Sequence, residues 1–75
     1  MKTLEAILAS PPERDSLVVQ LFVRDGGQWG EVFLEEGLFK IDLYPNSRGN
    51  NEWRLDLNEV LHVLQLAKDE LLKRQ

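Results

Sequence analysis

The residues that come closest to a catalytic or metal-binding pair in this sequence are Glu59 and His62. Their separation of three positions matches the Glu-x-x-His motif of carboxylate-bridged di-iron bundles. Such a centre needs a second copy of the motif and further carboxylates on facing helices, and the chain has a single His and no Cys. A second copy could come only from a dimer, and both residues fall on the polar side of a predicted helix. We therefore expect solvated side chains here, with no metal site and no cofactor.

Two carboxylates, Glu31 and Asp42, are the second candidate, because they fall side by side on neighbouring predicted strands. A close carboxylate pair is what glycoside hydrolysis uses. That chemistry also needs a concave site that excludes water, for which 75 residues leave little room. The sequence has no phosphate-binding loop, dinucleotide motif or G-x-S-x-G elbow, and its serines (Ser10, Ser16, Ser47) lie in predicted turns or connectors. The residues favour a protein that is not an enzyme.

Charge narrows the class of partner. Thirteen acidic residues against nine basic ones give a net charge of −4, and among the basic residues only Lys73 and Arg74 are adjacent. This balance disfavours nucleic acid and anionic membranes, since both attract concentrated positive charge. No apolar run reaches membrane-spanning length, and Glu5 interrupts the one run that resembles a secretory leader. We expect a cytoplasmic protein.

Length and composition predict one small folded domain over residues 1–75. The hydrophobic content is 43%, too high for a disordered chain. A domain of this size buries a limited core, and without Cys or a metal site it lacks the usual cross-links. Association with a second copy or with another protein is the remaining common route to stability.

Hydrophobic periodicity predicts a short helix followed by four strands. Leu4, Ile7 and Leu8 have helical spacing, with Thr3 as the cap and the prolines at 11 and 12 as the end. Runs rich in β-branched and aromatic residues then predict strands at 17–24, 28–34, 38–44 and 52–55.

A second helix is predicted from Asp56 onward, where the period changes from two to 3.6. Asp56 and Glu59 have capping-box spacing. The apolar side of this helix comprises Leu57, Val60, Leu61, Leu64, Ala67 and Leu71. The predicted fold class is α+β: a four-stranded antiparallel β-meander with the C-terminal helix packed on one face and the short N-terminal helix, in the order α-β-β-β-β-α.

Turn chemistry and alternation predict the register of the first hairpin. A two-residue turn at Asp25-Gly26 pairs Val19 with Val32 and Phe22 with Trp29. The side of the sheet under the long helix then carries apolar residues from all four strands: Leu17, Val19, Leu21, Val23, Val32, Leu34, Phe39, Ile41, Leu43, Trp53 and Leu55.

The next two connections are predicted in the same way. A two-residue turn that contains Gly37 sets Glu31 beside Asp42, which opposes this register because the charges are alike. The last strand pair sets Asp42 opposite Arg54, a surface ion pair worth a few tenths of a kcal/mol. Trp53 is predicted to be a core residue.

The other side of the sheet has an unusual composition. It carries four of the six aromatic residues, Phe22, Trp29, Phe33 and Tyr44, among charged groups, together with Val18 and Leu38. Large apolar groups mixed with charge are typical of a recognition surface. This face could be covered by the N-terminal helix of the chain itself or by a second protein surface, and the sequence favours the two equally.

These features favour a non-enzymatic protein-interaction module, acting as a homodimer or as a stoichiometric binder or inhibitor. The expected partner-binding residues are those six. Immunity and antitoxin proteins offer an analogy, in size, charge and aromatic surface only. A small-ligand or regulatory domain, with a pocket between the sheet and the N-terminal helix, is the alternative. A small enzyme is the third hypothesis.

Overall fold

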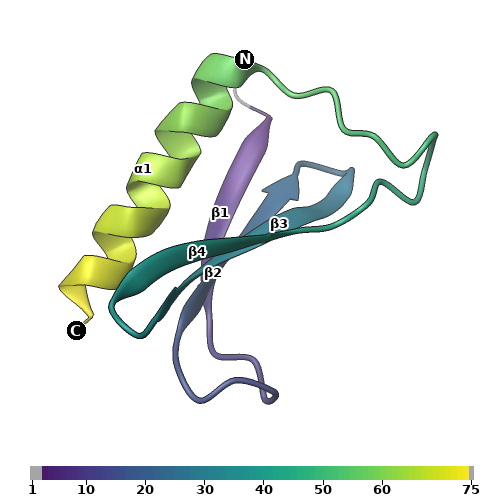
Figure 1. Cartoon of the computed structure of the whole chain (residues 1–75). Helices are drawn as coiled ribbons and strands as arrows, with labels where there is room; N and C mark the ends of the chain where they lie inside the picture. Colours follow the sequence, from purple (N-terminus) through teal and green to yellow (C-terminus); the bar gives the residue numbers. More distant parts are fainter. Residues whose placement is uncertain (1–2, 75) are drawn as a thin grey trace.

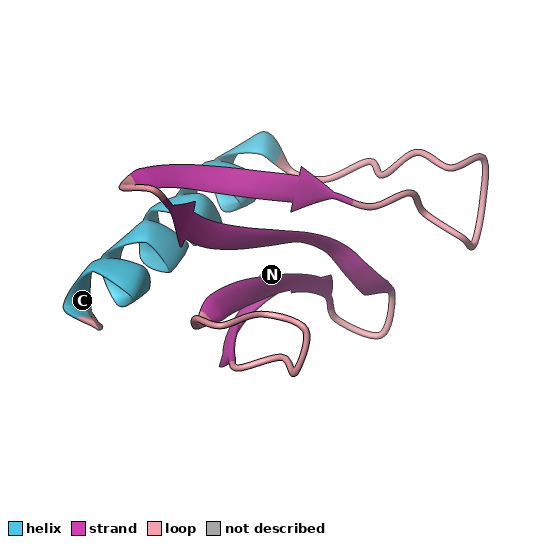
Figure 2. Ribbon diagram, turned by 60° about the horizontal axis from the view of Figure 1, so that its bottom comes forward, coloured by secondary structure: helices cyan, strands magenta, loops and turns pink. Residues whose placement is uncertain are grey.

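The computed structural model describes residues 3–74, which form one sheet and one helix. The elements are β1 (Leu4–Ala9), β2 (Val18–Val23), β3 (Gly27–Glu35), β4 (Leu38–Leu43) and α1 (Leu57–Lys73). The strands form an antiparallel meander in the order β1-β2-β3-β4, and α1 crosses one face of it (Figures 1 and 2). The predicted α+β meander with a C-terminal helix is confirmed, although two of its segments differ.

The N-terminal segment is a strand, so the predicted N-terminal helix is wrong. β1 pairs with β2 from Leu4 opposite Val23 to Ala9 opposite Val18. Leu4 and Leu8 fit a period of two as well as a helical period, and in the sheet both join the core under α1. Six residues form a marginal helix at best, whereas as a strand they satisfy the backbone along the edge of β2.

The turn between β3 and β4 has the predicted length and register. Glu36 and Gly37 form a two-residue loop with φ values of 54° and 79°, the positive values that a type I′ turn requires. Glu31 lies opposite Asp42 in the resulting register. The expected juxtaposition of like charges is therefore present.

The turn between β2 and β3 is one residue longer than predicted. Val23 pairs with Gly27, so the loop spans residues 24–26, and Asp25 within it has a φ of 60°. The predicted pairing of Val19 with Val32 is nevertheless confirmed. A β-bulge in β3 compensates for the longer turn.

The bulge sets the position of Trp29. Leu21 pairs with Gly30 and Phe22 with Gln28, which leaves Trp29 as the additional residue. A bulge breaks the strict alternation of side chains. Trp29 is 4% exposed and belongs to the core cluster under α1. Its predicted pairing with Phe22 and its predicted place on the opposite face are both wrong.

Residues 52–55 do not form the predicted fourth strand. After β4 the chain extends away from the sheet in a long loop with an isolated bridge between Asn46 and Asn51 (Figure 1). Trp53 packs against the core, as predicted, and its indole Nε1 donates a hydrogen bond to the Tyr44 carbonyl at 2.9 Å. The predicted ion pair with Arg54 is wrong, because Asp42 binds Arg14 in the connector between β1 and β2.

Helix α1 begins at the predicted cap. The Asp56 carboxylate accepts a hydrogen bond from the Glu59 backbone N–H at 2.9 Å, which satisfies one of the free donors of the first turn. The carboxylate of Glu59 accepts from the Thr3 backbone N–H at 2.8 Å. The start of the helix is thereby tied to the start of β1.

The buried stripe of α1 differs from the predicted one. Its buried residues are Val63, Ala67 and Leu71, which pack mainly over β1, β2 and β3. Leu57 and Leu61, predicted to be core residues, are 68% and 57% exposed. A helix about 10 Å wide covers two or three strands spaced about 4.8 Å apart, and four strands exceed its width.

Candidate interaction surface

The sheet face opposite α1 is partly covered by the connector between β1 and β2. Pro11 in this connector is buried, and the Arg14 guanidinium lies 4.1 Å from the centroid of the Phe33 ring. Val18 and Phe33 on this face are buried. The chain thus covers part of the face itself, with a connector in place of the expected helix.

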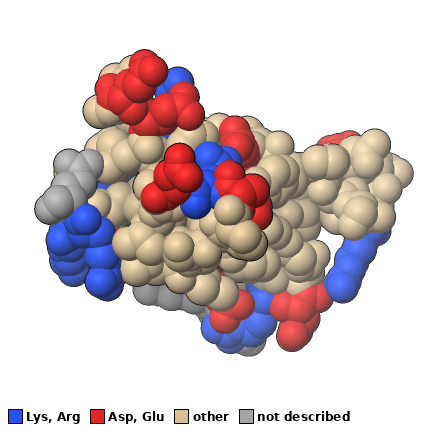
Figure 3. Space-filling model, turned by 90° about the horizontal axis from the view of Figure 1, so that it is seen from below, with Lys and Arg blue, Asp and Glu red and all other residues tan. Residues whose placement is uncertain are grey.

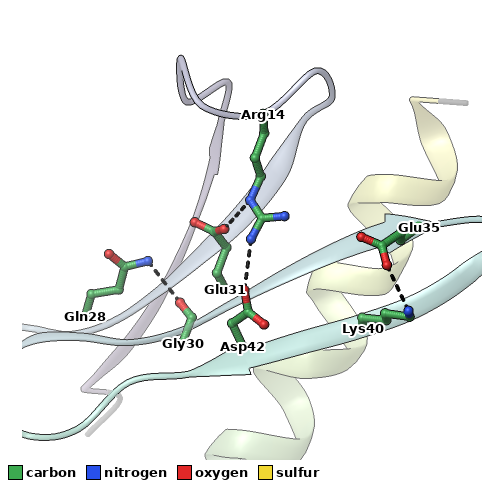
Figure 4. A network of polar contacts seen from close by, with 7 residues as sticks. All are labelled: Arg14, Gln28, Gly30, Glu31, Glu35, Lys40 and Asp42. Carbon is green, nitrogen blue, oxygen red and sulfur yellow. Dashed lines mark hydrogen bonds and ion pairs between the residues drawn. The ribbon is translucent and has the colours of Figure 1, made fainter.

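Arg14 binds both of the carboxylates that the sequence placed side by side. Its Nε lies 2.7 Å from Glu31 Oε2, and its Nη2 lies 2.9 Å from Asp42 Oδ2 (Figure 4). The Glu31 side chain is only 7% exposed, and a buried carboxylate needs such a partner. The pair of like charges is therefore compensated by a cation from the connector, which accounts for the cluster structurally.

The charges of this network shift the pKa of Arg14 and of Tyr44. Burial opposes the charge of Arg14, but the charges and hydrogen bonds of Glu31 and Asp42 outweigh it and raise the pKa of the guanidinium. Burial, and then the negative charges of Glu31 and Asp42, raise the pKa of the Tyr44 phenol above 10.0.

Seen from below, acidic and basic groups lie next to one another in small clusters with uncharged surface between them (Figure 3).

The structure separates the six expected partner-binding residues into two groups. Val18, Trp29 and Phe33 are buried within the chain, and Trp29 lies on the other side of the sheet from Phe33. Phe22 and Tyr44 are partly buried, and Leu38 is 61% exposed. The residues therefore do not form one continuous aromatic surface.

Exposed apolar side chains occur elsewhere, on β4 and on α1. We call the set Ile41, Leu43, Leu57 and Leu61, with the free edge of β4, the β4–α1 surface. Ile41 is 41% and Leu43 69% exposed, because α1 packs mainly over β1, β2 and β3. Sequence patterning predicts that all four are core residues. The period of a strand or helix indicates which face a residue occupies, and it does not indicate how much of that face another element covers.

An apolar groove connects the two elements of this surface. Phe39 and Ile41 of β4 form one wall and Leu64 and Lys68 of α1 the other. The Lys68 ammonium lies 5.3 Å from the centroid of the Phe39 ring. Leu57 and Leu61 precede Leu64 at helical spacing and so lie on the same side of α1.

The Glu59–His62 pair lies apart from this surface. His62 is exposed, and Glu59 is engaged by the Thr3 backbone N–H. No group of three potential metal-ligating side chains occurs within residues 3–74. The expected pocket between the sheet and an N-terminal helix has no counterpart, because that segment is β1. A hollow between the sheet and α1 is lined by Ala6, Leu8, Val19, Leu66, Ala67, Asp69, Glu70 and Lys73.

Comparisons with protein families, curated proteins and solved structures found no match to this chain. Over the described residues, no helix has the length and apolar character needed to cross a membrane.

Proposed function

We propose that this chain is a non-enzymatic protein-interaction module that binds its partner through the β4–α1 surface. The observation that carries the proposal is the distribution of exposed large apolar residues. Of the eight exposed large apolar residues within residues 3–74, Leu38, Ile41 and Leu43 lie on β4, and Leu57 and Leu61 lie on α1. Exposed apolar side chains on two elements that share an apolar groove mark an interaction site more often than a surface left in water.

The size of the chain supports the same proposal. A domain of 75 residues without Cys has a limited core, and covering an exposed apolar surface adds to its stability. The surface also adjoins a strand edge with unpaired backbone groups. A strand edge and an apolar groove are two features that protein partners recognise.

The test is binding by surface variants with a matched control. Leu43→Lys and Leu61→Lys place a charge in the β4–α1 surface, whereas Ile7→Lys places the same charge on β1, where Ile7 is 49% exposed. We expect the first two to weaken self-association or capture of a partner from native lysate by about tenfold or more, and Ile7→Lys to have little effect. Circular dichroism should show all three folded.

The proposal fails if the chain remains a monomer at high concentration and captures no protein. It also fails if Ile7→Lys weakens binding as much as Leu43→Lys does, because binding would then not be localised to this surface.

A further inference from the structure

The chemistry of the β4 edge identifies a specific occupant for the β4–α1 surface, a second copy of this chain. We propose that two copies pair edge to edge along β4, antiparallel about a two-fold axis, with Ile41 opposite Ile41 of the second copy. The result is a homodimer with one continuous eight-stranded sheet. This inference rests on the proposed function and names the partner of the same surface.

The backbone of β4 has three residues available for this pairing. The Tyr44 N–H donates to the Trp29 carbonyl, which marks that cross-strand pair as hydrogen-bonded. Hydrogen-bonded and non-bonded pairs alternate along an antiparallel ladder, so the even-numbered residues of β4 direct their N–H and C=O groups to β3. Phe39, Ile41 and Leu43 direct theirs to the free edge.

Charge selects the register of the two copies. With Ile41 on the two-fold axis, Lys40 lies opposite Asp42 of the second copy, and the same pair recurs on the other side of the axis. On the face with α1, Phe39 lies opposite Leu43 of the second copy. Opposite charges in directly facing positions stabilise an antiparallel pair.

The neighbouring registers that keep the same backbone groups facing each other are disfavoured. A shift by two residues in one direction sets Lys40 opposite Lys40 of the second copy. A shift by two residues in the other direction sets Asp42 opposite Asp42 of the second copy. Like charges in facing positions destabilise strand pairing, so only the register centred on Ile41 is complementary.

Existing contacts within the chain leave this complementarity intact. Lys40 Nζ lies 2.9 Å from Glu35 Oε1, and Asp42 binds Arg14 through one oxygen, Oδ2. The Lys40 and Asp42 side chains are 45% and 48% exposed, so both remain accessible to a second copy. An ammonium has three donors and a carboxylate has two oxygens, which allows each group a second partner.

The other edge of the sheet lacks these features. The Arg24 N–H donates to the Thr3 carbonyl, so by the same alternation Leu4, Ala6 and Leu8 face outward on β1. Symmetric pairing about Ala6 would set Glu5 opposite Ile7 and form no ion pair. Pairing of β1 with β4 of another copy would be a head-to-tail contact, which cannot close as a two-fold dimer. Only the β4 pairing is both complementary and closed.

The experiment uses two charge reversals, Lys40→Glu and Asp42→Lys, and circular dichroism checks that each variant is folded, because Lys40 also binds Glu35 and Asp42 also binds Arg14. Alone, each sets like charges opposite each other twice across the two-fold axis, and we expect the dimer dissociation constant to rise by about tenfold or more. Mixed in equal amounts, the two variants restore both opposite-charge pairs, and we expect the dimer to re-form. Sedimentation velocity distinguishes the chain of 8.7 kDa from its dimer.

Glu35→Gln is the matched control. It removes the partner of Lys40 within the chain and leaves the facing residues of the two β4 strands unchanged. It should dimerise as the unmodified protein does. A protein that is monomeric at all concentrations overturns the inference, as does a dimer that ignores both reversals or a mixture that stays monomeric. If Leu43→Lys still abolishes capture of another protein in those cases, the interaction module stands and only the identity of its partner is wrong.

Discussion

At the scale of the residue, Arg14 is the side chain on which the sheet face opposite α1 depends. It reaches Glu31, Asp42 and the Phe33 ring from a connector that sequence patterning could only describe as polar. A like-charge pair in neighbouring strands was visible in the sequence, but the cation that compensates it lies 17 positions before Glu31. Such a partner becomes identifiable only when the path of the connector is known.

Arg14→Gln should destabilise the fold. It leaves the 7% exposed Glu31 side chain next to Asp42 without a cation, and an unsatisfied buried group costs about 1–3 kcal/mol. Arg24→Gln is the control, since Arg24 and Glu5 are exposed and 3.6 Å apart, and it should change the free energy of unfolding by about 0.5 kcal/mol or less. Urea denaturation measures both. Equal effects of the two substitutions would show that the Arg14 network is not structural.

Tyr44 reports on the same network, because it is the only Tyr of the chain and its phenol titrates alone in the ultraviolet. Its raised pKa means that the folded state favours the neutral phenol, so its contribution to stability is present below pH 10.0 and declines as the pH rises through the folded-state pKa. Asp42→Asn removes one of the negative charges and should lower that pKa. A folded-state pKa at or below 10.0 would contradict the placement of Tyr44.

At the scale of the element, turn chemistry and long periodic runs predict the structure correctly. The Glu36-Gly37 turn, the register of β3 against β4 and the cap at Asp56 all follow from local sequence. The incorrect predictions concern segments whose conformation depends on tertiary contacts. Residues 4–9 fit a helical and a strand period equally, and the open edge of β2 selects the strand. The bulge at Trp29 breaks the alternation from which its face was assigned.

The bulge makes Trp29 an essential core residue. Trp29→Ala should cost about 3–5 kcal/mol, since it removes a fully buried aromatic ring from the cluster under α1. Trp53→Ala should cost less, because Trp53 is only partly buried and loses one hydrogen bond to Tyr44. Chemical denaturation followed by circular dichroism ranks the two variants. The reverse order would restore the face assignment made from alternation.

At the scale of the whole molecule, one helix lies on a sheet that is wider than the helix. The mismatch leaves Ile41 and Leu43 on the outermost strand, and Leu57 and Leu61 on the helix, partly in water. Sequence patterning identified the apolar character of these residues but assigned them to the core, because it contains no measure of how far α1 extends across the strands. The surface proposed for binding is thus the part of the predicted core that the chain does not cover.

Residue-resolved amide hydrogen exchange at low and high protein concentration tests the central claim, pairing of two copies along β4. The outward N–H groups of Phe39, Ile41 and Leu43 should gain protection as concentration rises, because each becomes hydrogen-bonded only in the dimer. The outward N–H groups of Ala6 and Leu8 on β1 should exchange rapidly at both concentrations. Exchange along β4 that does not depend on concentration, or protection that appears on β1 instead, would contradict the claim.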